Sequence, residues 1–105
     1  MAKTDAQRVE HEPAPIPDDV RAAIEAALDR KATRVTVMDL RGVGAFTDFF
    51  VVCTGTNVRQ VQAIADGVEE GLRAQGLRPA HVEGYDRAEW ILLDFFDFIV
   101  HVFMP

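Results

Sequence analysis

The chain has 105 residues, of which 49% are hydrophobic and 27% are charged, and its mean hydropathy is +0.01. This composition excludes wholesale disorder, and the length suffices for one hydrophobic core, so we expect a single domain. Seventeen acidic residues outnumber eleven basic ones, which gives a net charge of −6 and a pI near 4.9. An acidic surface repels phosphate backbones, so we expect no direct nucleic-acid contact as the main interaction. The charge allows a basic protein partner and would speed that encounter.

The single cysteine, Cys53, excludes an internal disulfide and a multi-thiolate metal site, and it fits a reducing cytoplasm. Residues 1–16 mix charges and prolines without an apolar run, so they predict a disordered lead-in and no secretory signal. The most apolar segment, 90–104, contains two aspartates and a histidine and falls short of the ~20 residues that span a bilayer. We therefore expect a soluble, cytoplasmic domain over residues 17–105 with no membrane contact.

Hydrophobic spacing predicts two helices and five strands in the order α-β-β-α-β-β-β. The expected helices and strands are 19–31, 34–40, 49–54, 58–75, 78–83, 89–95 and 97–103. This order indicates an α/β (α+β) domain with a mixed five-stranded sheet and helices packed on it. The unit 49–83 is expected to be a right-handed parallel crossover, and the other neighbouring strands can pair antiparallel.

Residues at the ends of these elements fit their expected positions. Asp18 can accept the free amide hydrogens of the first helix, and Thr56 or Asn57 can cap the second. Gly76 is placed as a left-handed stop. The nearly continuous apolar run at 49–54 is typical of a central strand that is buried on both faces.

The C-terminal strands predict an apolar sheet face that the helices do not cover. Twelve of the fifteen residues from 90 to 104 are apolar. Both alternation sets contain large side chains, with Trp90, Leu92 and Phe96 on one face and Ile91, Leu93 and Phe95 on the other. Two helices cover about one face of a five-stranded sheet, and an exposed apolar face of this size usually marks an interface. The alternative is that a terminal segment lies across it.

Candidate catalytic patterns are weak. Residues 54–57 join a strand to a helix, where amides could hold a phosphate, but they lack the Walker and dinucleotide-binding patterns. A glycine turn followed by a helix cap is therefore the favoured interpretation. Asp39, Asp48, Asp94 and Asp97 lie near strand ends, yet no Asp-x-Asp pair occurs to bind a catalytic magnesium.

A zinc site has equally little support. His81, His101 and Cys53 lie on three expected strands, but their spacing has none of the usual zinc-ligand forms. We expect His101 to make a cross-strand hydrogen bond. We expect Cys53, within an apolar strand, to be buried and inert. The sequence therefore predicts no metal and no cofactor.

Several blocks together resemble a known family. Residues 47–56, Thr-Asp-Phe-Phe-Val-Val-Cys-Thr-Gly-Thr, are similar to the Thr-Asp-aromatic-Phe-Val-Ile-x-x-Gly-Thr/Ser motif of the ribosomal silencing factor family, also called Iojap-like. The helix 57–66 resembles the helix that follows this motif in the family. Residues 83–84, 90–94 and 100–103 are similar to its Glu-Gly, Trp-x-Leu-Leu-Asp and Val-His-x-Phe blocks. These blocks occur in the family's order and cover about residues 20–103.

The resemblance implies a small domain that binds the large ribosomal subunit through the fourteenth large-subunit ribosomal protein. It implies that the domain sterically blocks subunit joining and represses translation, chiefly under nutrient limitation. The family's fold is similar to that of nucleotidyltransferases, but the catalytic Gly-Ser and paired aspartates are absent, so no enzyme activity is expected. Family members dimerise, and a homodimer is expected here.

The resemblance and the motif positions also point to partner-binding residues. Trp90 is the expected leading anchor, because tryptophan is enriched among residues that dominate binding energy. Tyr85, in the preceding loop, is the second. The remaining candidates orient strands or meet a basic partner, and they are Leu92, Asp94, His101 and Asp48.

The chain departs from the family pattern at two places. The family has Tyr-Gly-Asp between its last two strands, where this chain has Phe-Phe-Asp at 95–97, so the hairpin is expected to be looser or bulged. Family members continue beyond the His-x-Phe block with a further helix, whereas this sequence ends at Pro105. The sheet surface that such a helix would cover is left bare, which favours a homodimer.

Two other functions stay open from the residues alone. One is a nucleotidyltransferase-like enzyme in which Gly55 and Thr56 hold a triphosphate. The other is a self-assembling scaffold whose partner is a second copy of the chain. The ribosome-binding function is favoured over both, because a factor that acts by steric exclusion needs a surface and no reactive group.

Overall fold

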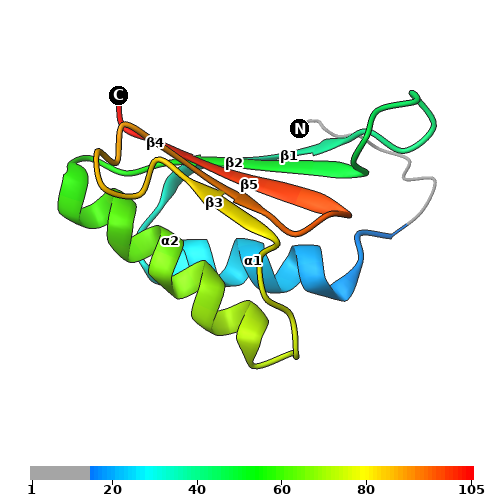
Figure 1. Cartoon of the computed structure of the whole chain (residues 1–105), viewed down its shortest axis with the longest axis horizontal. Coiled ribbons are helices and arrows are strands. Elements are labelled where there is room, and N and C mark those ends of the chain that lie inside the picture. The colour runs from blue at the N-terminus through cyan, green and yellow to red at the C-terminus, as the bar shows by residue number, and fades with distance from the viewer. Residues whose placement is uncertain (1–14) are drawn as a thin grey trace, which may run out of the picture.

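The computed structural model describes residues 15–105, in which two helices lie on one face of a five-stranded sheet (Figure 1). The elements are α1 (Asp18–Asp29), β1 (Thr33–Asp39), β2 (Phe49–Thr54), α2 (Val58–Arg73), β3 (His81–Glu83), β4 (Trp90–Asp94) and β5 (Phe98–Phe103). The expected mixed α/β architecture and element order are confirmed. The largest difference in bounds is at β3, which begins three residues later than predicted. The predicted disordered lead-in lies almost wholly in residues 1–14, outside the described residues.

The strand order is β1-β2-β5-β4-β3, with one parallel pair, β2 and β5, and three antiparallel pairs. The expected parallel crossover over residues 49–83 is present, but it joins strands that are not neighbours in the sheet. Strand β3 runs in the direction of β2 but lies at the far edge, with β5 and β4 between them. The reason is composition, because β5 is apolar at five of its six positions and takes the centre, whereas β3, with His81 and Glu83 among its three residues, tolerates an exposed edge position.

Local chemistry accounts for the ends of both helices. Pro17 is the N-cap of α1 and makes no side-chain cap, so the expected capping role of Asp18 is wrong. Asp18 instead lies in the first turn, where its negative charge faces the positive end of the helix dipole. Asn57 caps α2 as expected and accepts a hydrogen bond from the Gln60 amide at 2.8 Å. Gly76 has φ +83° and takes up the left-handed conformation predicted for it after the helix.

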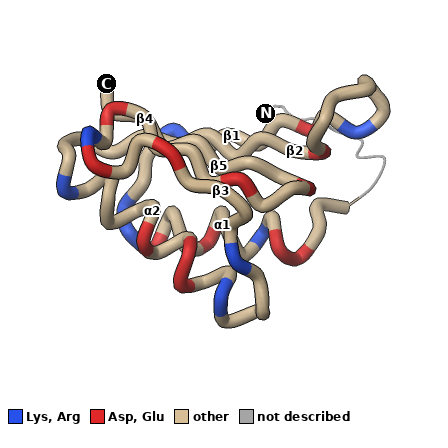
Figure 2. Tube along the Cα trace, in the orientation of Figure 1, with Lys and Arg blue, Asp and Glu red and all other residues tan. Residues whose placement is uncertain are grey.

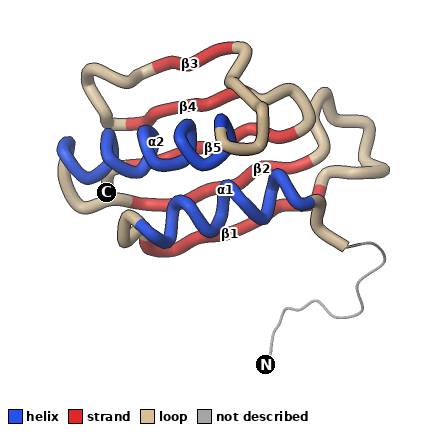
Figure 3. The backbone as a smooth tube through the Cα atoms, turned by 90° about the horizontal axis from the view of Figure 1, so that it is seen from below, coloured by secondary structure: helices blue, strands red, loops and turns tan. Residues whose placement is uncertain are grey.

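The two helices pack closely against each other because of two glycines on α2. A Cβ atom on Gly67 would lie 2.8 Å from Cγ of Arg30, and one on Gly71 would lie 3.2 Å from Cβ of Ala26. Arg30 crosses between the helices and donates hydrogen bonds to the Ala63 carbonyl at 2.8 Å and to Glu70 at 3.0 Å. The paired helices cover the same face of the sheet (Figure 3).

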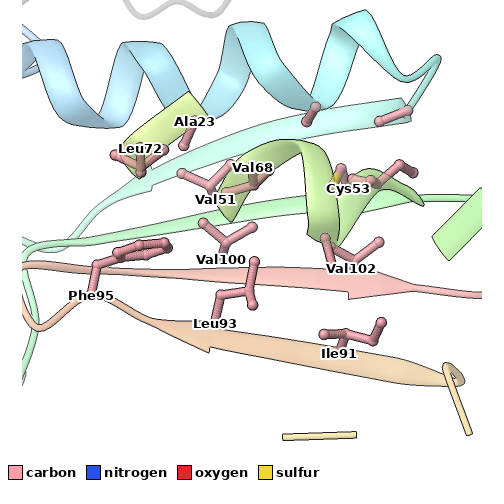
Figure 4. Close-up of a cluster of buried hydrophobic side chains, with 14 of the residues drawn as sticks. Ala23, Val51, Cys53, Val68, Leu72, Ile91, Leu93, Phe95, Val100 and Val102 are labelled. Atoms are coloured by element: carbon pink, nitrogen blue, oxygen red, sulfur yellow. The ribbon is translucent and has the colours of Figure 1, made fainter. Parts of the chain in front are cut away.

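The hydrophobic core lies between this helix pair and the sheet (Figure 4). Side chains at alternate positions of the strands point toward the helices, and those labelled in β2, β4 and β5 are Val51, Cys53, Ile91, Leu93, Val100 and Val102. They meet Ala23 of α1 and Val68 and Leu72 of α2. Because successive strand residues point to opposite faces, their neighbours in sequence lie on the face without helices.

The turn between β4 and β5 is tight, which corrects the expectation of a loose or bulged hairpin. The Phe95 amide donates to the Phe98 carbonyl at 3.0 Å, and Asp94 Oδ1 accepts from the Phe96 amide at 2.8 Å. Thr47 adds a hydrogen bond from its hydroxyl to the Phe96 carbonyl at 2.8 Å. Phe96 has φ +73°, a conformation that glycine adopts without strain, and this position corresponds to the glycine of the family pattern.

Gly84, at the end of β3, provides a test of the fold. It has φ +79°, and a Cβ atom there would overlap the backbone oxygen of Trp90. We expect Gly84→Ala to lower the free energy of unfolding by about 2–4 kcal/mol, measured by urea denaturation. Gly42→Ala is the matched control, because Gly42 has φ +85° but open space around it, so only about 1 kcal/mol of backbone strain is expected. Equal losses in the two variants would contradict this account.

Candidate functional site

The face of the sheet opposite the helices is the candidate functional site, and we call it the open face. It is built from alternate residues of the three inner strands, which are Phe50, Val52, Trp90, Leu92, Asp94, Ile99, His101 and Phe103. The register sets Trp90 opposite Phe103 and Leu92 opposite His101. Figure 1 shows both helices on the other side of the sheet, so no helix of the described residues covers this face.

Four rings form an aromatic cluster on the open face, made of Phe50, Trp90, His101 and Phe103. The indole Nε1 of Trp90 donates a hydrogen bond to Nδ1 of His101 at 3.0 Å. The bond joins the edges of the two rings, whose planes are 20° apart and whose centroids are 5.8 Å apart. The rings therefore lie side by side, edge to edge. Phe103 is nearly parallel to both rings, and the edge of the cluster is closed by Phe50, which meets His101 at 81° and 4.8 Å.

This hydrogen bond fixes the protonation state of His101. A ring nitrogen that accepts a hydrogen bond carries no proton, so the neutral ring holds its proton on Nε2. Nε2 is buried and has no hydrogen-bond partner among the described residues. Burial lowers the pKa of His101, which keeps the ring neutral near pH 7. The expected cross-strand hydrogen bond of His101 is confirmed, with Trp90 as its donor.

His101 should make stability depend on pH. Its pKa in the folded state is lower than the usual value of 6.5, so its contribution to stability is complete above about pH 6.5 and is lost as the pH falls. We expect the urea concentration at the unfolding midpoint to decrease when the pH is lowered from 7.5 to 5.5. The fall should be smaller in His101→Asn, which cannot titrate. An equal fall in the two proteins would assign the pH dependence to other groups.

The structure brings together four of the six predicted partner-binding residues. Trp90, Leu92, Asp94 and His101 share the open face, and Trp90 is 49% exposed. Asp48 is exposed at the end of this face where β2 begins, and its amide donates to the Asp97 carbonyl at 2.9 Å.

Tyr85 does not join the other predicted residues. Its hydroxyl donates to the Asp66 carboxylate of α2 at 3.0 Å, and its carbonyl accepts from Gln62 Nε2 at 2.9 Å. The side chain is half-buried against the core on the helix side of the sheet. The hydrogen bond to Asp66 also raises the pKa of Tyr85. Its observed contacts fasten the loop between β3 and β4 to α2.

Phe50 and Phe103 belong to the aromatic cluster but were not among the predicted site residues. The run 49–54 suggests a strand buried on both faces, whereas β2 is buried only at alternate residues. Phe49 points into the core, and the open-face positions Phe50 and Val52 are half-buried. The periodicity of β2 is hidden because both of its faces carry apolar side chains.

In the strand–turn–helix at the start of α2, side chains of the segment itself accept hydrogen bonds from its backbone amides. The Thr56 amide donates to Oε1 of Gln60 at 2.7 Å, and the Gln60 amide donates to Asn57. A Cβ atom on Gly55 would lie 3.0 Å from Val61, so the glycine fits close packing of the turn on the helix. These contacts support a turn with a helix cap, as the sequence predicts, and occupy amides that a phosphate would need.

Other reactive groups are also committed to structural contacts. Asp39 pairs with Arg41 at 2.7 Å, and Asp94 holds the Phe96 amide. Within residues 15–105, no three His, Cys, Asp or Glu side chains come together in a way that could hold a metal ion. In the same part of the chain, no helix has the length and apolar character needed to cross a bilayer.

Cys53 is buried in β2, and burial raises the pKa of its thiol to about 11. At pH 8 only about one thiol in a thousand is ionised at such a pKa, and the thiolate is the reactive form. We expect the native protein to resist iodoacetamide at pH 8 and to react fully in 6 M guanidinium chloride. Labelling of the native protein as fast as that of the unfolded chain would contradict this assignment.

Comparison with known proteins identifies the class. Residues 13–105 match the family model described as "Ribosomal silencing factor during starvation". Proteins named ribosomal silencing factor RsfS from Halalkalibacterium halodurans and Bacillus subtilis are 38% and 34% identical over 84 residues, which are 80% of this chain and 72% and 71% of those proteins. A crystal structure of protein CV0518 from Chromobacterium violaceum superposes with a TM-score of 0.82 at 33% identity, covering 88% of this chain and 77% of that one.

The chain belongs to the ribosomal silencing factor family. The resemblance drawn from the sequence motifs is therefore confirmed, and so is the fold that it implies. The names of these relatives are regulatory and describe no enzymatic reaction.

Proposed function

We propose that this protein binds the large ribosomal subunit with its open face and sterically prevents the small subunit from joining. It thereby represses translation, chiefly under nutrient limitation, in the cytoplasm. The observation that carries the proposal is the aromatic cluster, which lies on a sheet face that no helix of residues 15–105 covers. Exposed apolar surface of this kind marks interaction sites.

Steric exclusion also suits the chemistry of the domain. Blocking an interface requires a rigid surface of adequate size and no reacting group. The candidate groups at the start of α2 and in β2 are committed to structure, since the Thr56 and Gln60 amides are hydrogen-bonded to side chains and the Cys53 thiol is buried. We therefore propose a factor that is not an enzyme and needs no cofactor.

The charge of the domain favours a ribosomal protein over ribosomal RNA as the contact. The net charge is −6, and acidic positions are spread over the helices and the loops (Figure 2). On the open face the aromatic cluster is neutral, and Asp94 adds a negative charge at its border. A basic protein is attracted by such a surface, whereas an RNA backbone is repelled. The partner implied by the family resemblance, the fourteenth protein of the large subunit, is the partner we propose.

Trp90 is the proposed central anchor of this contact. Its indole is half-exposed, and the hydrogen bond to His101 and the contact with Phe103 hold its ring in place before any partner binds. A side chain that is already ordered loses little entropy on association. The indole N–H is also satisfied within the domain, so a partner can cover the ring without burying an unpaired donor.

A homodimer through the same face is the second candidate. The homodimer is supported by the apolar character of the open face, because a second copy of the chain would cover that face. Sedimentation at micromolar concentration tests it, since a dimer is expected to dissociate in Trp90→Ala. A monomer in the wild-type protein would remove this candidate without affecting ribosome binding.

The main test is co-sedimentation of the protein with purified large and small subunits. We expect wild-type protein to migrate with the large subunit and to reduce the joined-ribosome peak. Trp90→Ala should bind about 30-fold more weakly, because a central tryptophan contributes roughly 2 kcal/mol or more. Leu28→Ala is the matched control, since Leu28 is equally exposed, at 51%, but lies on α1.

Three outcomes separate the possibilities. Loss of large-subunit binding in Trp90→Ala alone, with an unchanged circular dichroism spectrum, supports the open face. Equal binding of wild type, Trp90→Ala and Leu28→Ala would place the contact elsewhere on the domain. Migration of the wild-type protein with neither subunit would overturn the proposed function.

A further inference from the structure

Exposed apolar side chains also lie at the end of the sheet away from Trp90. They are Val43 and Phe46, in the loop between β1 and β2, and Phe96, in the turn between β4 and β5. Their exposed fractions are 68%, 82% and 73%, the highest of any large hydrophobic side chains in the described residues. We call these three residues the terminal patch.

The two segments that carry the terminal patch are fastened to each other. The Thr47 hydroxyl donates to the Phe96 carbonyl at 2.8 Å, and Thr47 is itself buried. The Asp48 amide donates to the Asp97 carbonyl at 2.9 Å. These bonds extend the pairing of β2 and β5 beyond the strands, so the loop and the turn form one continuous end of the sheet.

Phe96 is held in a costly conformation that the turn between β4 and β5 requires. Glycine would adopt it without strain, and the fold makes no use of the phenyl ring. Its φ of +73° lies in the left-handed region, which a bulky side chain enters only under constraint. The hydrogen bonds from Asp94 and Thr47 maintain that conformation. Its ring is mostly exposed, and the core contains Phe95 and Phe98 but not Phe96. Strain kept at an exposed residue indicates a role outside the packing of the domain.

The charges around the terminal patch are mainly negative. Asp48 and Asp97 are exposed beside it, and Asp94 lies under the turn. Asp39 is neutralised by Arg41, whose guanidinium also lies over the ring of Phe49 at 4.7 Å. Figure 2 shows these acidic positions gathered where β2 begins and where the strands turn. An apolar patch with this border is complementary to apolar side chains flanked by lysine or arginine.

We infer that the terminal patch is a second anchor of the docking surface, and that it receives a basic segment of the same ribosomal protein in which lysine or arginine flanks an apolar side chain. This inference rests on the proposed function. The length of β5 separates the patch from Trp90 and Phe103, at the far end of the aromatic cluster, by about 17 Å at ~3.3 Å per residue, whereas Phe50 lies at the near end of the cluster. A standard interface buries roughly 800 Å² on each partner, which is wide enough to include both.

A second copy of the chain fits the terminal patch less well than a basic partner. In a symmetric contact centred on the patch, the aspartates of one copy would face those of the other. Like charges brought together oppose association, whereas lysine or arginine opposite Asp48 and Asp97 would favour it. We therefore assign the patch to the ribosomal partner.

Phe96→Gly separates binding from stability. Glycine adopts φ +73° without strain, so the Tm is expected to stay unchanged or to rise. The affinity for purified large subunits, measured by co-sedimentation, is expected to fall about tenfold, because an exposed aromatic anchor is lost. A fall in affinity without a fall in Tm cannot result from misfolding.

Two further variants and one control complete the test. Phe46→Ser removes the other ring of the patch and should weaken large-subunit binding to a similar degree. Asp48→Asn with Asp97→Asn should weaken binding at 50 mM salt and make it less sensitive to 300 mM salt. Leu28→Ser is the matched control for an exposed apolar side chain away from the sheet, and it should bind as wild type.

The outcomes are distinguishable. One outcome is that Trp90→Ala weakens binding to the large subunit, whereas Phe96→Gly and Phe46→Ser leave it unchanged. This result would overturn the inference and leave the proposed function standing. Loss of self-association in the patch variants, with unchanged subunit affinity, would also overturn it by assigning the patch to a homodimer. Absence of wild-type binding to the large subunit would overturn both proposals.

Discussion

The position of both helices on one face of the sheet is the constraint on which the rest of the structure depends. Five strands at ~4.8 Å spacing give a sheet about as wide as two helices packed side by side, so α1 and α2 together cover one face. Gly67 and Gly71 let them pack at close range, and Arg30 fastens them together. The other face is then left to its own side chains, and these are aromatic and aliphatic where solvent would favour polar ones.

The hydrogen bond between Trp90 and His101 suits the uncovered face both to solvent exposure and to contact with a partner. It satisfies the only N–H of the indole, and it orients the imidazole so that Nδ1 accepts. Its cost is the buried Nε2, which has no acceptor among residues 15–105. A polar pair between apolar rings specifies one arrangement, because any rotation of either ring loses the bond. The face is therefore ordered before contact, which suits recognition by shape.

The elements and their faces could be predicted from the sequence because both are local. The alternation in β4 predicts that Trp90 and Leu92 lie on one face of the sheet and Ile91 and Leu93 on the other, as the structure shows. Strand order is not local, and the position of β5 between β2 and β4 depends on which strands are buried most deeply. The place of Tyr85 in a loop predicts a position on the docking surface, which the structure does not show. The direction of Tyr85 is set by Asp66, nineteen residues earlier in the chain, and no spacing rule reveals that contact.

The strand–turn–helix at the start of α2 shows how the fold suits recognition better than catalysis. A turn of this kind can hold a phosphate only when the first amides of the helix are free. Here Gln60 accepts from the Thr56 amide, and Asn57 accepts from the Gln60 amide, so two of the amides at this turn are bonded to side chains of the domain itself. That closure stabilises the helix pair and thereby the sheet above it. The surface chemistry of the domain then lies on the opposite side of the sheet, which presents the rings of Trp90 and its neighbours.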